Sequence, residues 1–312
     1  MATFTPSQVS CPDTAPDDPR IGRLLGEKLA NQATPQVVIM GFPSDEGVRR
    51  NGGRVGAAQG SDALRQVFFR LTPDAADGGP FQELLGHTRD LGNLTISGQV
   101  EKDQEALGEA LAPFISENVL PIIIGGGHET AYGHFLGYVK AQQEIAILNW
   151  DAHPDVRELK QGQAHSGSPF RQALLHPSKT CRSYRVAGLL PHSVSKANLN
   201  FIIDQGGGYH WKDSLSREQI DEIYGSFSKT LMASFDLDAV DQAYAPGVSA
   251  PAVNGLSADL WLHAAYRAGQ CPHVKSMDIV ELNPLFDRDH QTARLAALTL
   301  WYFLKGLSER SL

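Results

Sequence analysis

Short apolar runs alternate with longer stretches of helical periodicity along most of the chain. The runs are rich in Val, Ile and Leu, which is typical of strands that are buried on both faces of a sheet. The predicted strands are Gln36–Gly41, Leu120–Ile124, Ile145–Trp150, Arg182–Gly188, Leu199–Ile203, Thr230–Leu237 and Val274–Leu282.

Between these runs, apolar residues recur at the three- and four-residue spacing of an amphipathic helix. The predicted helices are Ala57–Phe69, Gln104–Glu117, Thr130–Gln142, Pro169–Leu175, Ser216–Tyr224, Ala258–Ala268 and Gln291–Leu307. Strands that alternate with helices in this way predict βαβ units. We therefore expect an α/β fold whose parallel central sheet is covered by helices on both faces.

The 312-residue chain contains neither an internal repeat nor a long linker. We therefore expect one domain over residues 21–312. Residues 1–20 are polar and contain several Pro and Asp, so they are predicted to form a flexible N-terminal arm.

Three polar motifs follow predicted strands, and all of them contain residues that bind metals. Because ligands gather beyond the carboxyl ends of parallel strands, these motifs are expected to meet at one edge of the sheet. Together they provide two imidazoles and four carboxylates, which is enough for two divalent metal ions. The candidate metal ligands are His128 in GGGHE, Asp151, His153 and Asp155 in DAHPD, and Asp236 and Asp238 in FDLD.

Charge supports the metal interpretation. Four clustered aspartates repel one another and do not all stay ionised without cations, whereas two divalent ions balance four negative charges. An oxygen-rich set without thiolates favours Mn²⁺, with Fe²⁺, Co²⁺, Ni²⁺ or Zn²⁺ also possible. Two such ions can lower the pKa of a shared water, which indicates a binuclear metallohydrolase.

Each motif also has a simpler interpretation when it is taken alone. GGGHE can form a turn with a capping glutamate, and the two aspartate motifs can form surface turns or caps. A nucleotide-binding loop is disfavoured because neither GxGxxG nor GxxxxGK[ST] is present. The occurrence of all three motifs after strands favours metal binding.

The formal net charge of −8 gives no support for nucleic-acid or anionic-membrane partners. No apolar run approaches the roughly 20 residues of a membrane-spanning helix, and the first residues lack the order of a signal peptide. The three cysteines are far apart and show no CxxC pattern, so we expect a cytoplasmic protein without disulfides.

The motifs GGGHE (125–129), WDAHPD (150–155) and SFDLDAVDQAYAPG (234–247) resemble those of the ureohydrolases, the family of arginases and agmatinases. The resemblance extends over roughly residues 37–307. It implies a three-layer α/β/α domain, two Mn²⁺ ions per subunit, and hydrolysis of a guanidinium or amidinium C–N bond. It also implies a homotrimer or homohexamer. Gln242 departs from the family, which usually has proline there, and we expect only a local effect on the loop.

Position by position, the resemblance assigns metal binding to the six residues named above, with Asp151, Asp238 and also Asp236 as candidates to bridge the ions. Asp238 would also help to stabilise the tetrahedral intermediate. His165 in GQAHSG matches the proton-shuttle histidine of the family, and its alternative is a loop histidine. Glu281 in DIVELNP matches the glutamate that holds the planar cationic head of the substrate. A carboxylate can accept two parallel N–H bonds from an amidinium, although Glu281 could also simply end a strand.

The substrate is predicted from the segment GFPSDEGVRRNGGRVGAAQGSDALR (41–65), which resembles the formimidoylglutamase branch of the family. Arg157 matches that branch as well. N-formimidoyl-L-glutamate carries two carboxylates, for which guanidinium groups are suitable donors. Arg157 is therefore a candidate clamp, and Arg54 is a weaker one together with Arg49 and Arg50. The alternative for each arginine is a surface salt bridge or a subunit contact.

We thus expect cleavage of the formimidoyl C–N bond of N-formimidoyl-L-glutamate, giving glutamate and formamide. One alternative is another ureohydrolase that releases urea from arginine, agmatine, guanidinobutyrate or guanidine. The other is a non-catalytic member of the family. That alternative predicts a missing ligand or head-group residue, and none of the matched positions is missing.

Overall fold

A nine-stranded sheet forms the centre of the molecule in the computed structural model, which describes residues 3–15, 17–29, 33–76 and 79–310. The strand order is β1-β3-β2-β4-β9-β8-β5-β6-β7, and β1 alone is antiparallel to its neighbour. The strands are β1 (Phe4–Thr5), β2 (Val37–Phe42), β3 (Thr88–Leu94), β4 (Leu120–Gly125), β5 (Ile145–Trp150), β6 (Cys181–Leu189), β7 (Gly208–Trp211), β8 (Leu231–Asp236) and β9 (Val274–Val280).

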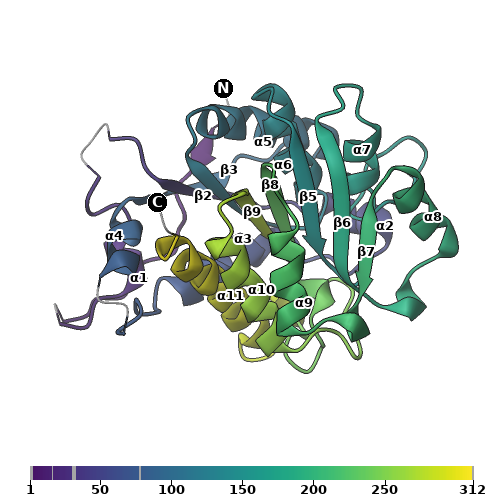
Figure 1. Ribbon diagram of the computed structural model, residues 1–312. Coiled ribbons are helices and arrows are strands. Elements are labelled where there is room, and N and C mark those ends of the chain that lie inside the picture. Colours follow the sequence, from purple (N-terminus) through teal and green to yellow (C-terminus); the bar gives the residue numbers. More distant parts are fainter. Residues whose placement is uncertain (1–2, 16, 30–32, 77–78, 311–312) are drawn as a thin grey trace.

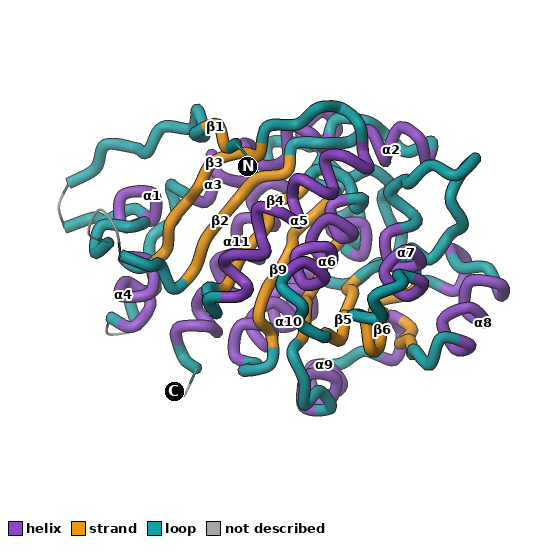
Figure 2. The backbone as a smooth tube through the Cα atoms, turned by 90° about the horizontal axis from the view of Figure 1, so that it is seen from above, coloured by secondary structure: helices purple, strands orange, loops and turns teal. Residues whose placement is uncertain are grey.

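Helices cover both faces of this sheet, so the predicted three-layer α/β/α fold is confirmed (Figures 1 and 2). One layer contains α3 (Gly60–Phe68), α9 (Arg217–Gly225), α10 (Ala258–Gln270) and α11 (Gln291–Ser308). The opposite layer contains α5 (Val100–Ser116), α6 (Thr130–Lys140), α7 (Pro169–Leu175) and α8 (Lys196–Asp204). Shorter helices are α1 (Ile21–Leu24), α2 (Glu46–Asn51) and α4 (Pro80–Gly86), and the 3-10 turns are Ala57–Gln59, Pro191–Ser193, Lys212–Ser214, Leu237–Ala239 and Pro284–Phe286.

Two hydrophobic cores lie on opposite faces of the sheet. In β4, Ile122 and Ile124 contribute to the core beneath α3, α10 and α11, whereas Ile123 contributes to the core beneath α5 and α6. Every residue of β2, β4, β5 and β8 is buried. This explains why these strands read as continuous apolar runs.

Four adjacent strands position the chemistry. In the order β4-β9-β8-β5 they are parallel, and their carboxyl ends therefore lie at one edge of the sheet. The register pairs Trp150 with Phe235 and Asp236 with Val280. Residues that directly follow these strands are thus brought together although they are far apart in the sequence.

One predicted strand was wrong. Residues Leu199–Ile203 belong to helix α8, which begins after Ser195, and the side chain of Ser195 accepts a hydrogen bond from the N–H of Asn198. A short apolar run does not distinguish a strand from one face of a helix, and the serine cap decided the outcome. The edge strand β7 instead begins at Gly208, at the end of a glycine-rich segment.

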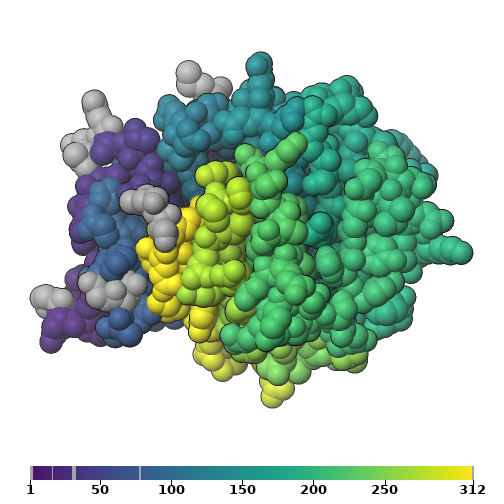
Figure 3. All heavy atoms as spheres, in the orientation of Figure 1, coloured from purple at the N-terminus to yellow at the C-terminus, as the bar shows by residue number. Residues whose placement is uncertain are grey.

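Strand β1 and helix α11, from opposite halves of the chain, pack on neighbouring parts of the domain: β1 on β3, and α11 on α3 and α4. Strand β1 pairs antiparallel with Leu94 and Asn93 of β3, so part of the N-terminal segment extends the sheet. The division between a flexible arm and a domain at residue 21 stays a prediction. Helix α11 lies beside N-terminal segments (Figure 3), where Trp301 Nε1 donates to the carbonyl of Thr72 at 2.9 Å.

Within the described ranges, none of the helices combines the length and the apolar character that crossing a bilayer requires.

Candidate metal centre

The loop after β4 depends on close backbone packing. A Cβ atom on Gly126 would lie 1.8 Å from the carbonyl oxygen of Ser44, so only glycine fits there. Glu129, two residues after Gly127, accepts a hydrogen bond from the N–H of Gly47 at 2.9 Å. The glycines of GGGHE therefore let the 44–47 loop pack against the end of β4, and they place His128 at the edge of the sheet.

Four of the six predicted metal ligands form one buried cluster. Ligand atoms of His128, Asp151, Asp155 and Asp236 all lie within 4.8 Å of one another. Nδ1 of His128 is 2.8 Å from Oδ2 of Asp236, 2.9 Å from Oδ2 of Asp155 and 3.4 Å from Oδ2 of Asp151. The three carboxylates thus converge on one imidazole nitrogen.

The other two predicted ligands, His153 and Asp238, line a cavity that Asp155 and Asp236 of the cluster also line. Nδ1 of His153 is 3.4 Å from Oδ1 of Asp151, whose other oxygen faces His128. The backbone N–H of Asp238 donates to Oδ1 of Asp236 at 2.8 Å. The carboxylate of Asp151 therefore lies between the two imidazoles, and all six residues belong to one site. Their roles as ligands stay predictions.

Two acids of the site have left-handed backbone angles, with φ of 44° at Asp155 and 68° at Glu281. Such angles are uncommon for residues other than glycine, and they concentrate at functional sites. At Glu281 the turn comes directly after β9, where its N–H donates to the carbonyl of Gly126 at 2.8 Å. The carboxylate is thereby directed into the site instead of across the sheet.

Glu281 has one oxygen bound and one oxygen open. Oε1 accepts a hydrogen bond from the N–H of His128 at 2.6 Å, whereas Oε2 is buried without a hydrogen-bond partner among the described residues. Burial raises the pKa of this carboxyl to about 7. Glu281 and Ser249 both line the cavity, and the nearby Ser249 side chain opposes the effect of burial on the pKa of Glu281. Because the two side chains form no hydrogen bond of good geometry, Oε2 can accept one from another donor beside the cluster.

Burial and neighbouring charges shift the pKa values of the carboxyl groups in the site. Burial, followed by the charge of Asp151, raises the pKa of Asp236 well above its usual range. Burial and the charge of Asp236 do the same to the pKa of Asp238. Burial acts to raise the pKa of Asp151, but the neighbouring imidazoles of His128 and His153 outweigh it and lower that pKa to about 2.

The two histidines respond in the opposite direction. Burial lowers the pKa of His128, but Asp236, Asp151 and Asp155 outweigh it and hold the pKa well above the usual value. Burial also acts to lower the pKa of His153, but Asp151, Asp155 and Asp238 outweigh it and raise that pKa to about 9. Nδ1 of His128 faces three carboxylate oxygens and still lacks a hydrogen bond of good geometry within the described part of the chain. This donor set fits divalent cations.

The cavity at the site measures about 200 Å³, which is small beside the roughly 300–1,000 Å³ of typical ligand pockets. Its rim carries Arg157, whose exposed guanidinium donates to Oδ1 of Asn51 at 3.3 Å. The backbone N–H of Arg157 donates to the carbonyl of Gly167 at 2.9 Å. The lining residues are Val48, Asn51, Gly52, Gly53, His153, Asp155, Arg157, Ser166, Asp236, Asp238, Ser249, Ala250 and Glu281.

Arg54 lies elsewhere. Its guanidinium donates to the backbone carbonyls of Pro246 and Val248 and lies 4.2 Å from the centre of the Phe286 ring. It is not among the residues that line the cavity. The two weaker candidates are also engaged, because Arg49 and Arg50 form ion pairs with glutamates. A role for Arg54 in substrate binding stays a prediction without a contact to support it.

His165 is buried, and both of its ring nitrogens contact the backbone. Nδ1 accepts from the N–H of Gly167 at 3.1 Å, so Nε2 carries the proton and donates to the carbonyl of Glu158 at 2.9 Å. His165 is not among the residues that line the cavity. Its role as a proton shuttle stays a prediction, which requires the ring to give up one of these bonds.

Two details of the 242–250 loop were not predicted. The backbone N–H of Gln242 donates to the carbonyl of Ala252 at 2.8 Å, a bond that proline cannot make. The N–H of Ala250 donates to Oδ1 of Asp238 at 3.2 Å, and Ser249 lines the cavity. A backbone donor or a single serine has no sequence pattern that marks it as part of a site. The only sequence signal near this loop was the motif SFDLDAVDQAYAPG (234–247).

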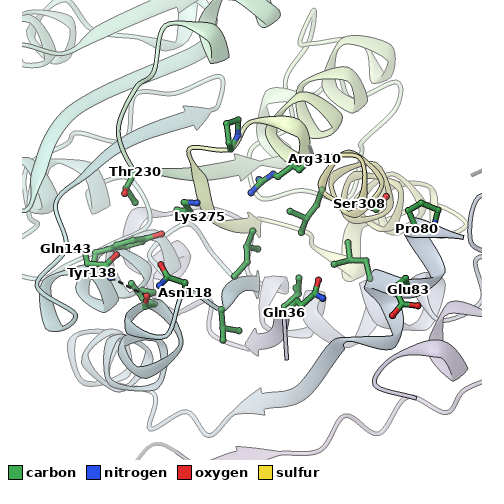
Figure 4. Close-up of a pocket in the computed structure, with 17 residues that line it drawn as sticks. Gln36, Pro80, Glu83, Asn118, Tyr138, Gln143, Thr230, Lys275, Ser308 and Arg310 are labelled. Atoms are coloured by element: carbon green, nitrogen blue, oxygen red, sulfur yellow. Dashed lines mark hydrogen bonds between the residues drawn. The ribbon is translucent and has the colours of Figure 1, made fainter. Parts of the chain in front are cut away.

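The described part of the chain also contains a cavity of about 560 Å³ at the opposite edge of the sheet (Figure 4). Tyr138, Lys275 and Arg310 are among its lining residues, and none of the predicted site residues is.

A metal-type cluster at the carboxyl edge of a three-layer α/β/α sheet defines the class of this protein. The model of the arginase family matches residues 35–305, and the chain belongs to that family.

Within the family, the chain is similar to formimidoylglutamases. It is 33% identical to the formimidoylglutamase of Chromobacterium violaceum over 90% of this chain and 91% of that protein. It is 36% identical to the Rhodococcus jostii formimidoylglutamase over 83% of this chain and 82% of that protein. The crystal structure of Trypanosoma cruzi formiminoglutamase with Mn²⁺ superposes with a TM-score of 0.85 at 30% identity, covering 95% of this chain and 100% of that chain.

The contacts of His165 predict a structural role that can be separated from proton transfer. His165→Ala should lower the free energy of unfolding by about 1–3 kcal/mol, because two buried hydrogen bonds to the backbone are lost. Urea unfolding measures this change, with the exposed His192→Ala as a control that should unfold like the wild type. Rescue of turnover by added imidazole, with unchanged stability, would instead support the shuttle.

Proposed function

We propose that this arginase-family hydrolase cleaves the formimidoyl C–N bond of N-formimidoyl-L-glutamate, giving glutamate and formamide. The observation that carries the proposal is the convergence of two histidines and four aspartates beside the open oxygen of Glu281. Similarity to formimidoylglutamases over most of the chain supports the choice of substrate.

Two Mn²⁺ ions suit this ligand set, and Fe²⁺, Co²⁺, Ni²⁺ or Zn²⁺ are chemically compatible with it. One ion would be held by the cluster around His128. His153 and Asp238 would hold the second, and Asp151 faces both positions. When bound, such ions supply a water of lowered pKa and neutralise negative charge that develops on the substrate.

The residues of the chain would then orient the substrate. Oε2 of Glu281 is positioned to accept N–H bonds from the planar amidinium, while Oε1 stays bound to the backbone of His128. Arg157 lies on the rim of the same cavity, where its guanidinium can pair with a carboxylate. The two groups therefore recognise opposite ends of a short molecule that is cationic at one end and anionic at the other.

The proposal also includes an oligomeric state and a cytoplasmic location. A homotrimer or homohexamer is expected from the family resemblance. The three cysteines are free of disulfides, which agrees with a reducing cytoplasm.

The first test of the proposal is a substrate panel for the Mn²⁺-loaded protein. N-formimidoyl-L-glutamate should release formamide at a rate well above that of any guanidino compound. Arginine, agmatine, guanidinobutyrate and guanidine are assayed beside it for urea. Urea from one of these compounds, without formamide from the first, would establish another ureohydrolase activity at the same metal centre.

Glu281→Gln removes the charge that faces the amidinium but keeps an oxygen to accept the N–H of His128. We expect kcat/KM to fall roughly 10- to 100-fold, because a hydrogen bond between charged groups is lost. Mn²⁺ content, measured by elemental analysis, should stay at the wild-type value. Loss of metal together with activity would show that Glu281 supports the site instead of binding substrate.

Arg157→Ala should raise KM for N-formimidoyl-L-glutamate about tenfold or more, because a charge-assisted bond to a carboxylate is lost. Steady-state kinetics are compared with those of Arg182→Ala, which removes an exposed arginine paired with Glu144. An analogue without the side-chain carboxylate identifies the carboxylate that is bound. Equal KM values for Arg157→Ala and the wild type would contradict the clamp.

A further inference from the structure

A chain of hydrogen bonds runs from the metal cluster into the interior of the protein. It connects His128, in the loop after β4, with residues of α6, β8 and β9, and none of its members is more than 1% exposed. In order, its members are His128, Ser234, Asp278, His134, Ser276 and Tyr138. Beyond His128, no member belongs to the predicted site.

The first links define the proton on His128. The hydroxyl of Ser234 donates its single hydrogen to Oδ1 of Asp278 at 2.5 Å. Oγ of Ser234 also lies 3.0 Å from Nε2 of His128, and toward that atom it can only accept. Nε2 of His128 therefore carries a hydrogen, and in the neutral ring the lone pair falls on Nδ1. Nδ1 is the atom that faces the aspartates of the cluster.

The links beyond Asp278 follow one direction. Oδ2 of Asp278 lies 2.7 Å from Nδ1 of His134, which must donate because a carboxylate only accepts. Nε2 of His134 then accepts from the hydroxyl of Ser276 at 2.6 Å, and Ser276 accepts from the hydroxyl of Tyr138 at 2.6 Å. With both imidazoles neutral, as metal binding at Nδ1 of His128 requires, each of these hydrogen bonds has one donor and one acceptor. The carboxylate of Asp278 receives donors from both sides.

Stability alone does not explain this arrangement. A fully buried carboxylate loses much of its hydration, and replacing buried polar groups with apolar groups of similar shape is often neutral or stabilising. The other end of the hydrogen-bond network is also shielded from water, because the side chain of Tyr138 is buried at the wall of the cavity shown in Figure 4. What the network does provide is a fixed direction for the hydroxyl of Ser234.

We propose that Asp278 and His134 are positioning residues for metal binding. By holding the hydroxyl of Ser234 toward itself, Asp278 keeps the hydrogen of His128 on Nε2 and the lone pair on Nδ1. His134 holds Asp278 in place by its own hydrogen bond from α6. The inference rests on the proposed metal centre. Partners behind a metal-binding histidine set its tautomer and orientation, and their loss typically costs 10- to 100-fold in affinity.

The test compares two replacements of His134 by Mn²⁺ affinity, measured by equilibrium dialysis on the purified full-length protein. His134→Leu removes the donor to Asp278 and should weaken Mn²⁺ binding at least tenfold. His134→Asn offers an amide N–H at a similar place and should recover most of the affinity. Circular dichroism and thermal unfolding confirm that each variant is folded.

Thr299→Val is the matched control, because it removes a buried hydrogen bond to Trp261 away from the metal cluster. It should lower thermal stability and leave Mn²⁺ affinity unchanged. If His134→Leu fails to fold, Asp278→Asn replaces it, keeping the shape of the side chain while removing its charge, and should also weaken binding.

Wild-type affinity in a folded His134→Leu or Asp278→Asn variant would overturn the positioning role while leaving the proposed function intact. Failure of the wild-type protein to bind Mn²⁺ would overturn the proposed metal centre, and the positioning role with it.

Discussion

Repulsion among buried carboxylates is the constraint on which the rest of this structure depends. At separations near 4–5 Å and an effective dielectric constant of about 20, each pair of like charges costs roughly 3–4 kcal/mol. Asp151, Asp155 and Asp236 lie within this range of one another. Their three pairs would cost on the order of 10 kcal/mol, which is comparable with the total stability of about 5–15 kcal/mol of a typical domain. The cluster is therefore compatible with folding only when positive charge compensates it or when some of its carboxyl groups are protonated, as the raised pKa of Asp236 indicates. Divalent cations supply the most compensating charge in the least space.

The fold meets this constraint in part by fixing two of these acids with backbone groups. Asp151 accepts from the N–H of His153, and Asp236 accepts from the N–H of Asp238. Such bonds orient the oxygens without adding another charged side chain to the site. The parallel strands β4, β9, β8 and β5 bring the acids to one edge of the sheet. Left-handed backbone angles at Asp155 and Glu281 direct the carboxylates of these two residues into the site. Backbone strain is thus placed where the chemistry needs it.

The fold class and the metal-type residues were predictable because their signals are local. A buried parallel strand is a continuous apolar run, and each ligand motif directly follows such a strand or ends it. Other features were not local. Strand β3 (Thr88–Leu94) is polar in sequence and becomes a strand only through its pairing with β2, while the apolar run Leu199–Ile203 forms a helix. The engagement of Arg54 with the 246–248 carbonyls and the hydrogen bond between His134 and Asp278, 144 residues apart, depend on tertiary structure alone. A single sequence contains the residues for such contacts but not their distances.

Chemistry and specificity are carried by different parts of this molecule. The candidate ligands and Glu281 lie at the ends of core strands, and an amidinium and a guanidinium both present planar N–H groups that a carboxylate can accept. If Glu281 binds substrate as proposed, it therefore cannot distinguish a formimidoyl compound from a guanidino compound. In the proposed function, discrimination comes from the other end of the cavity, where the loop residue Arg157 is held by Asn51 at the end of α2 and by Gly167 on a loop. Loops change more readily than buried strands, so one metal centre can serve several substrates while its rim selects among them. In this chain the rim carries the guanidinium of Arg157, and in the proposed binding mode it pairs with a carboxylate at the far end of the substrate.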